Sequence, residues 1–144
     1  MQKALALAAL GSAGAVGIAA VAMPALASSE STSHTLKFVA VTQKQTQPSK
    51  RTFVEDAEAE RGGKVIGFGI LDGRITSSTG GVGVVVFGTK AGLIYAKVTI
   101  NNTPTTPGTI TGGTGSFKGA SGTISVTNLN KSGSRASVTI RYHS

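Results

Sequence analysis

The sequence predicts an all-β fold, either a β-sandwich or a closed β-barrel, on three observations. Short segments rich in Val, Ile and Thr recur through residues 35–143, which is typical of strands. Clusters of Gly, Asn, Ser, Thr and Pro separate these segments and favour turns. No segment in this range has a convincing helical repeat. Closing the sheet into a barrel would also remove exposed strand edges, which are an aggregation hazard in Val-rich strands.

The expected strands follow one another with a turn between each pair. The first, TLKFVAVT, places β-branched and aromatic residues at alternate positions, and the later ones are rich in Val, Ile and Thr. The window FVEDAEAER (53–61) is the only one that favours a helix, and two glycines end it. Shorter strands are candidates at 51–56 and 109–111. In chain order, the clear strands are 35–42, 64–76, 82–89, 93–100, 121–129 and 134–143.

The first 27 residues have the pattern of a secretory signal peptide. A cationic start at Lys3 precedes an apolar run over 4–22, and Ala25 and Ala27 form an A-x-A cleavage site. A membrane anchor is the alternative, but the run is rich in Ala and Gly and is short for a span of ~20 apolar residues. We therefore expect a secreted, extracellular protein with no stable membrane insertion after cleavage.

What remains after cleavage is roughly 117 residues, the size of one domain. We expect residues 28–34 to be a flexible N-terminus and residues 35–144 to form a single barrel domain. The chain has no cysteine, which excludes disulfides, thiolate metal sites and a cysteine nucleophile.

The chain is basic, with a formal net charge of +8. Nucleic-acid binding is one interpretation of such a charge, but it favours clustered cations and stacking aromatics. Here the Lys and Arg residues are scattered and there is no tryptophan. Solubility and a mild attraction to anionic surfaces are the better explanation, so we expect no nucleic-acid partner.

The glycine-rich stretch ITGGTGSFKGASGTISV (110–126) contains five glycines and suggests a phosphate-binding loop. A P-loop needs a glycine directly before its lysine, but Phe117 precedes Lys118. A dinucleotide loop needs a third glycine at the position that Lys118 occupies, and a helix after it. We therefore expect no nucleotide cofactor and interpret these glycines as a turn with positive φ at a barrel corner, with Phe117 folded back as a plug.

Few residues here are suited to acid–base chemistry. The acidic cluster in 55–60 is interpreted as a solvated turn, whereas Asp72 lies at the end of an apolar strand. Asp72 and Arg74 share one strand face, which predicts a local ion pair, and on a lumen face this pair could polarise a ligand. Tyr95 and Tyr142 stand near cations and are either core residues or hydrogen-bond donors in a pocket. The only histidines are His34 and His143, at the two ends of the domain, and we expect no metal site.

Two strand segments, 65–71 and 93–100, carry apolar or small residues on both faces. In a strand that is buried on one face only, apolar and polar residues alternate more regularly. Another subunit could cover the outer wall of the barrel at these strands, which indicates oligomerisation.

The second half of the chain contains TGGTGSFKGASGTISVTNL and SRASVTIRYHS, and the upstream segments GKVIGFGILDG and KAGLIYAKVTI extend the pattern more weakly over about 35–143. In these motifs the chain resembles the allene oxide cyclase and dirigent barrel family, with short secreted actinobacterial members the most similar. It implies a closed, antiparallel, eight-stranded, calycin-like barrel with a mostly hydrophobic lumen, commonly assembled as a trimer. Family members cyclise a fatty-acid epoxide or guide the coupling of phenoxy radicals, and both reactions need orientation more than strong acids or bases.

The resemblance transfers few residues. The cyclase branch has an acid in its first strand and this chain has none there, while the acidic pair of the dirigent branch is matched only by Glu55 and Asp56. We therefore leave the catalytic residues open. The candidate pocket residues are Asp56, Asp72, Arg74, Tyr95, Arg141 and Tyr142.

Two functions are compatible with these observations. In the first, the barrel binds a small hydrophobic or aromatic molecule and steers its cyclisation or coupling, as a cofactor-independent cyclase or isomerase would. In the second, it is a non-catalytic extracellular structural or interaction protein. An open apolar cavity with converging polar groups would favour the first, and a solidly packed lumen the second.

Overall fold

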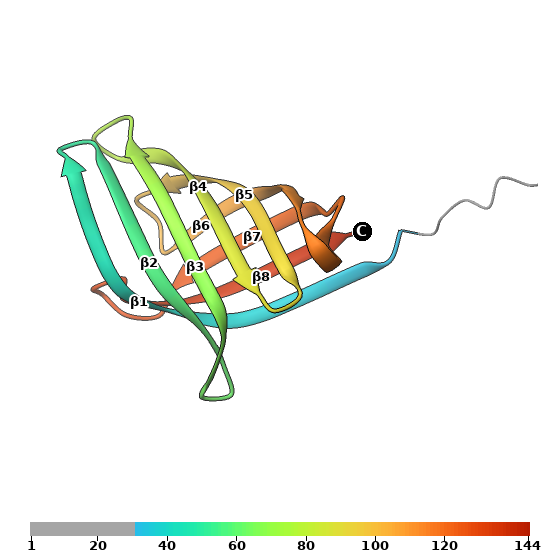
Figure 1. Ribbon diagram of the computed structural model, residues 1–144. Coiled ribbons are helices and arrows are strands. Elements are labelled where there is room, and N and C mark those ends of the chain that lie inside the picture. The colour runs from blue at the N-terminus through green and yellow to red at the C-terminus, as the bar shows by residue number, and fades with distance from the viewer. Residues whose placement is uncertain (1–30) are drawn as a thin grey trace, which may run out of the picture.

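A computed structural model describes residues 31–144, so the expected signal peptide (1–27) lies outside the described residues. Eight strands pair in chain order, each antiparallel to its neighbours, and β8 pairs back with β1 to close the barrel (Figure 1). This arrangement confirms the predicted closed, antiparallel, eight-stranded β-barrel. The strands are β1 (Ser33–Ser49), β2 (Thr52–Arg61), β3 (Lys64–Ile75), β4 (Gly80–Thr89), β5 (Gly92–Asn101), β6 (Thr105–Gly113), β7 (Ser121–Asn128) and β8 (Arg135–His143), with one 3₁₀ turn, η1 (Gly115–Phe117).

The structure differs from the sequence prediction most in β2. The helix-favouring window 53–61 is a strand, and the acidic cluster lies along this strand rather than in a turn. It pairs over its length with β1 on one side and β3 on the other, and these hydrogen bonds outweigh an intrinsic helix propensity of a few tenths of a kcal/mol per residue. Both shorter candidate strands are present and longer than expected, since 51–56 falls largely within Thr52–Arg61 and 109–111 within Thr105–Gly113.

The first strand begins before the predicted domain boundary. Ser33 and His34 pair with His143 and Tyr142 of β8, and His34 stacks on the Tyr142 ring at a centroid distance of 5.0 Å. The two histidine-bearing ends of the domain therefore lie side by side. Pairing with β8 makes the end of the expected flexible segment, Ser33 and His34, part of the barrel wall.

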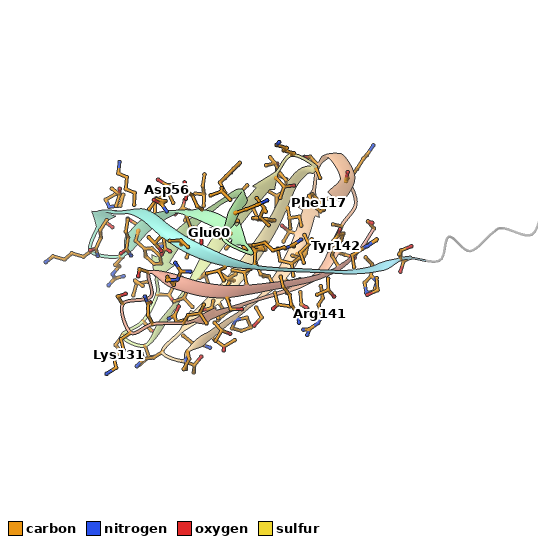
Figure 2. The ribbon with its side chains drawn as sticks, turned by 90° about the horizontal axis from the view of Figure 1, so that it is seen from below. Asp56, Glu60, Phe117, Lys131, Arg141 and Tyr142 are labelled. Carbon is orange, nitrogen blue, oxygen red and sulfur yellow. The ribbon has the colours of Figure 1, made fainter. Side chains whose placement is uncertain are left out.

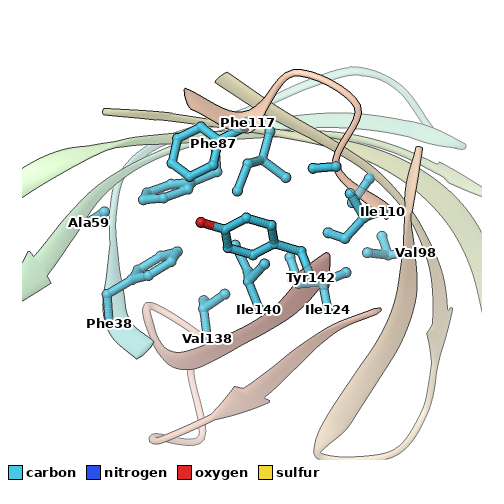
Figure 3. Packing of buried hydrophobic residues seen from close by; sticks show 13 residues of the cluster. Phe38, Ala59, Phe87, Val98, Ile110, Phe117, Ile124, Val138, Ile140 and Tyr142 are labelled. Carbon is cyan, nitrogen blue, oxygen red and sulfur yellow. The ribbon is translucent and has the colours of Figure 1, made fainter. Parts of the chain in front are cut away.

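Alternation along the strands divides the wall into an inner and an outer face. Ala57, Gly69, Phe87 and Ile94 face one another across successive strand pairs and belong to the inner face. The inner residues form one hydrophobic core inside the barrel (Figure 3). Fully buried members of this core include Phe87, Ile94 and Ile140.

One end of the barrel is filled with side chains. η1 lies at this end, near the C-terminus (Figure 1), and turns Phe117 into the core, where it is 5% exposed. The Phe117 ring meets the Tyr142 ring edge to face at 5.6 Å. Gly115 and Gly119 have φ of 59° and 77°, so the glycine-rich stretch forms the predicted positive-φ turn and Phe117 is the predicted plug.

Candidate ligand-binding cavity

The opposite end of the barrel holds a cavity of about 360 Å³. Its inner end is formed by Phe38 and Phe87, whose rings stack at 4.2 Å with an angle of 14° between their planes. The walls are apolar and come from strands all around the barrel. They include Ala40, Leu71, Val85, Val98, Ile124 and Val138.

Polar side chains gather at the mouth of this cavity. They are Thr42, Gln45, Glu55, Thr106, Asn128, Ser132 and Ser134. Among the cavity-lining residues, Glu55 is the only one with a charged side chain. The cavity is therefore apolar inside and polar at its mouth, as small-molecule sites usually are.

An irregularity in the pairing of β1 with β2 positions Glu55. The register shifts between Thr42 and Lys44, so that Gln43 is an extra residue in β1. This bulge lets both Thr42 and Gln45 face the lumen, and Gln45 lies opposite Glu55. The Thr42 hydroxyl donates a hydrogen bond of 2.5 Å to Oε1 of Glu55.

The loop between β7 and β8 borders the mouth and is held in place by its own hydrogen bonds. Asn130 donates to the Ser134 hydroxyl at 2.9 Å, and the Ser132 and Ser134 hydroxyls are 2.9 Å apart. The Thr42 amide donates to the Ser134 carbonyl oxygen at 2.9 Å. Lys131 of this loop lies at the end of the molecule opposite Phe117 and Tyr142 (Figure 2).

None of the six pocket residues predicted from the sequence lines this cavity. Asp56 is exposed on the outer face of β2, opposite Lys44. Arg141 is exposed on β8 and points away from the barrel (Figure 2). Tyr142 does face inward, but it is buried at the closed end, beyond the Phe38–Phe87 stack.

The other three predicted residues lie on the outer wall. Asp72 and Arg74 of β3 line an open groove on the outer surface, which continues past Lys97 of β5 to Thr109 of β6. Tyr95 is on the same face of β5 as Lys97, two residues away. Strand alternation therefore puts Asp72 and Arg74 on one face, as predicted, but that face is outside the barrel.

The predicted Asp72–Arg74 ion pair does not form. Within residues 31–144, the ion pair present is Arg135–Glu60, at 3.9 Å. Residues two apart on a strand stand about 6.6 Å from each other, and closing this gap at an exposed site gains only ~0–1 kcal/mol. Hydration of the two separate charges competes successfully with pairing.

Glu55 was missed as a pocket residue, although a signal was present in the sequence. Its neighbours at two residues' distance are Phe53 and Ala57, which are apolar, whereas those of Asp56 are Val54 and the charged Glu58. With this window taken as a strand, the period of two puts Glu55 on the face that carries the aromatic and small residues. The helix-favouring composition of the window hid this pattern.

An apolar patch covers the outer face of β3 and β4. It consists of Val65, Phe68, Ile70, Val82 and Val84, each between 37% and 57% exposed. The patch adjoins the outer groove, since Val82 and Val84 also line it. Val65, Phe68 and Ile70 belong to segment 65–71, where the sequence analysis expects another subunit, whereas the second expected segment, 93–100, contributes no residue to the patch.

Two further structural findings concern the described range. Residues 31–144 contain no group of three or more His, Cys, Asp or Glu side chains placed to hold a metal ion. They also contain no helix long and apolar enough to span a bilayer.

Comparisons with known proteins support the fold. No protein-family model matches the sequence, and no curated protein matches it either. Among solved structures, one of pyocyanin demethylase is similar at a TM-score of 0.64 and 16% identity, covering 76% of this chain and 99% of that one. Two dirigent proteins named as pterocarpan synthases are also similar. For GePTS1 the TM-score is 0.58 at 14% identity, covering 79% of this chain and 90% of that one. For PsPTS1 the TM-score is 0.53 at 14% identity, covering 78% of this chain and 92% of that one.

The expected resemblance to dirigent proteins is therefore seen in the fold, while the resemblance to allene oxide cyclases stays a prediction. At these identities the similarity concerns the fold alone. The chain has the barrel fold found in dirigent proteins and in pyocyanin demethylase.

Proposed function

We propose that this protein is a secreted barrel that binds a small hydrophobic or aromatic molecule in its lumen. The observation that carries the proposal is the cavity above the Phe38–Phe87 stack, which has apolar walls and a polar mouth. Its volume of about 360 Å³ lies in the lower part of the ~300–1,000 Å³ range of small-molecule sites. A barrel that served only as a scaffold would have no need for an unfilled lumen.

The lining favours a flat, apolar ligand. Phe38 and Phe87 offer an aromatic surface at the inner end, and rings prefer offset-stacked or edge-to-face contacts with such a surface. The names of the similar structures refer to the demethylation of pyocyanin and the synthesis of pterocarpans. Both names associate this barrel fold with chemistry on small organic molecules, which supports the proposal.

The proposal includes a chemical role, in which the barrel steers the cyclisation or coupling of its ligand without a cofactor. A narrow lumen restricts the conformations of a bound molecule, and holding reacting atoms in place can supply ~7–11 kcal/mol of a barrier. The mouth adds hydrogen-bonding groups at one end, namely Thr42, Gln45 and Glu55. These groups would fix which end of the ligand enters first.

Gly69 allows a direct test of lumen binding. It lines the cavity, and a Cβ added to it would meet no atom within 4 Å. The series Gly69→Ala, Gly69→Val and Gly69→Leu should therefore fill the cavity step by step without a clash at the Cβ position. We expect the neutral fluorophore N-phenyl-1-naphthylamine to bind the wild-type protein and to lose affinity along the series.

The matched control is Val84→Leu, which adds bulk to the outer face. It should bind the fluorophore as the wild type does. Equal affinity of wild type and Gly69→Leu, with both folded by circular dichroism, would place binding outside the lumen and contradict the proposal.

A second proposal concerns assembly, and a different observation favours it. The outer apolar patch is exposed to solvent in an isolated barrel. Apolar surface of this kind marks an interaction site. Charges of both signs, Asp72, Arg74 and Lys97, border it, so that a second copy could offer complementary charges. We propose that the protein forms a homotrimer through this face, a closed ring in which each patch meets its neighbour.

A further inference from the structure

Glu55 is an unneutralised carboxylate in an otherwise uncharged cavity. The chain has 14 Lys and Arg residues against six acids, yet no Lys or Arg lines the cavity in the described range. Glu55 also takes no part in the ion pair found there. Its negative charge therefore has no balancing charge from the cavity wall.

One oxygen of this carboxylate is free to bind a ligand. Oε1 accepts the hydrogen bond from Thr42, and within residues 31–144 Oε2 accepts none from a side chain. Oε2 is not buried either, since no buried polar side-chain atom in this range lacks a partner. It is therefore accessible in the mouth of the cavity, where a ligand group can reach it.

A carboxylate that a ligand removes from water is stabilised only by a cation or by hydrogen-bond donors. A ligand with a carboxylate of its own would place two like charges together at the mouth, or would bury its charge against Phe38 and Phe87. A neutral apolar ligand would desolvate Glu55 and supply neither an opposite charge nor a hydrogen-bond donor. A ligand with a cationic, hydrogen-donating head offsets this cost most fully, because it supplies both the opposite charge and the donors.

We propose that the ligand of this cavity is an amine whose protonated nitrogen binds Oε2 of Glu55 while its aromatic or apolar body packs on Phe38 and Phe87. An ammonium group has three N–H donors. Gln45, opposite Glu55 in the register, and the hydroxyl of Ser134 are further acceptors at the mouth. The inference rests on the proposed binding function and adds the charge class of the ligand.

The test uses three probes with the same aromatic body and different heads. These are 2-naphthylmethylamine as its ammonium form, 2-naphthalenemethanol as the neutral analogue and 2-naphthoate as the anion, each titrated by calorimetry at pH 7. We expect the ammonium probe to bind about tenfold more tightly than the alcohol, or about 1.4 kcal/mol, and the carboxylate to bind most weakly.

Two variants assign the effect to Glu55. Glu55→Gln removes the charge but keeps a carbonyl oxygen that can accept from Thr42, so we expect the tenfold preference to vanish while the alcohol binds as before. Asp56→Asn removes the same charge from the adjacent, outward-facing residue and should leave all three affinities unchanged. The affinity for the alcohol reports whether each variant retains its cavity.

The possible failures are distinguishable. Equal binding of the three probes to the wild-type protein would overturn the amine inference and leave lumen binding intact. A preference for the ammonium probe that survives in Glu55→Gln would overturn the role of Glu55. If none of the probes binds, both the proposed function and this inference are wrong.

Discussion

Phe38 and Phe87 stack face to face across the inside of the barrel, with ring centroids 4.2 Å apart and an angle of 14° between the planes. They come from β1 and β4, which are not neighbours in the sheet, so the stack spans the lumen rather than following its wall. On one side of it lies the packed end with Phe117 and Tyr142, and on the other lies the cavity. The stack separates the part of the barrel that gives stability from the part that is open to a ligand.

Loss of this stack should destabilise the protein strongly. Phe87 is 2% exposed, and we expect Phe87→Ala to lower the free energy of unfolding by about 3–5 kcal/mol, because it removes a buried ring and leaves a cavity. Urea denaturation followed by circular dichroism measures the change. Leu129→Ala, in the loop at the mouth and 55% exposed, is the control and should stay within about 0.5 kcal/mol. If Phe87→Ala lowered the free energy of unfolding by less than about 1 kcal/mol, the stack of the two rings would not be important for stability.

The glycines around η1 should differ in their tolerance of a side chain. Gly115 and Gly119 both have positive φ, but a Cβ on Gly115 would lie 2.3 Å from the carbonyl oxygen of Ala91, whereas one on Gly119 would meet no atom within 4 Å. We expect Gly119→Ala to cost the ~1–2 kcal/mol of a left-handed residue, and Gly115→Ala to cost clearly more because the clash adds to the strain. Thermal melts of the two variants side by side give the order. Equal costs would mean that the backbone of the η1 turn shifts to relieve the clash.

Tyr142 should act in packing and not in binding. It is 8% exposed and contacts Phe117 and His34 at the closed end, and it does not line the cavity. We expect Tyr142→Phe to bind N-phenyl-1-naphthylamine with wild-type affinity, and Tyr142→Ala to lose about 3–5 kcal/mol of stability through the missing ring. Should Tyr142→Phe weaken the fluorophore tenfold, the hydroxyl would belong to the binding site, as the sequence first suggested.

The outer patch should control assembly. We expect light scattering to give the mass of a trimer for the wild-type protein and that of a monomer for Val84→Asp, because a charge in an apolar interface is left without a partner. Leu129→Asp is the matched control. It makes the same kind of change at an exposed residue (55%) in the loop at the mouth, away from β3 and β4, and should keep the wild-type mass. A wild-type protein that stays monomeric at high concentration would contradict the proposed trimer.

Several features of this protein were determined by the sequence alone, because they depend on neighbouring residues. Alternating β-branched and aromatic residues predict strands such as Thr35–Thr42, since the side chains of a strand point alternately to its two faces. The spacing of the glycines around Phe117 excludes a phosphate loop and predicts a positive-φ turn, because only glycine adopts such φ without strain. The all-β class and the plug at Phe117 follow from these local properties, and both are seen in the structure.

The tertiary structure decided which faces are inside. Hydrogen bonding to β1 and β3 makes a strand of a segment whose composition favours a helix. The extra residue between Thr42 and Lys44 sets which side chains of β1 meet Glu55 in the lumen. Asp72 and Arg74 share a strand face both in the sequence prediction and in the structure, but only closure of the barrel puts that face outside. Strand alternation alone puts the adjacent acids Glu55 and Asp56 on opposite faces. Register, bulges and closure depend on partners far away in the chain, and they decide that the face of Glu55 is the inner one.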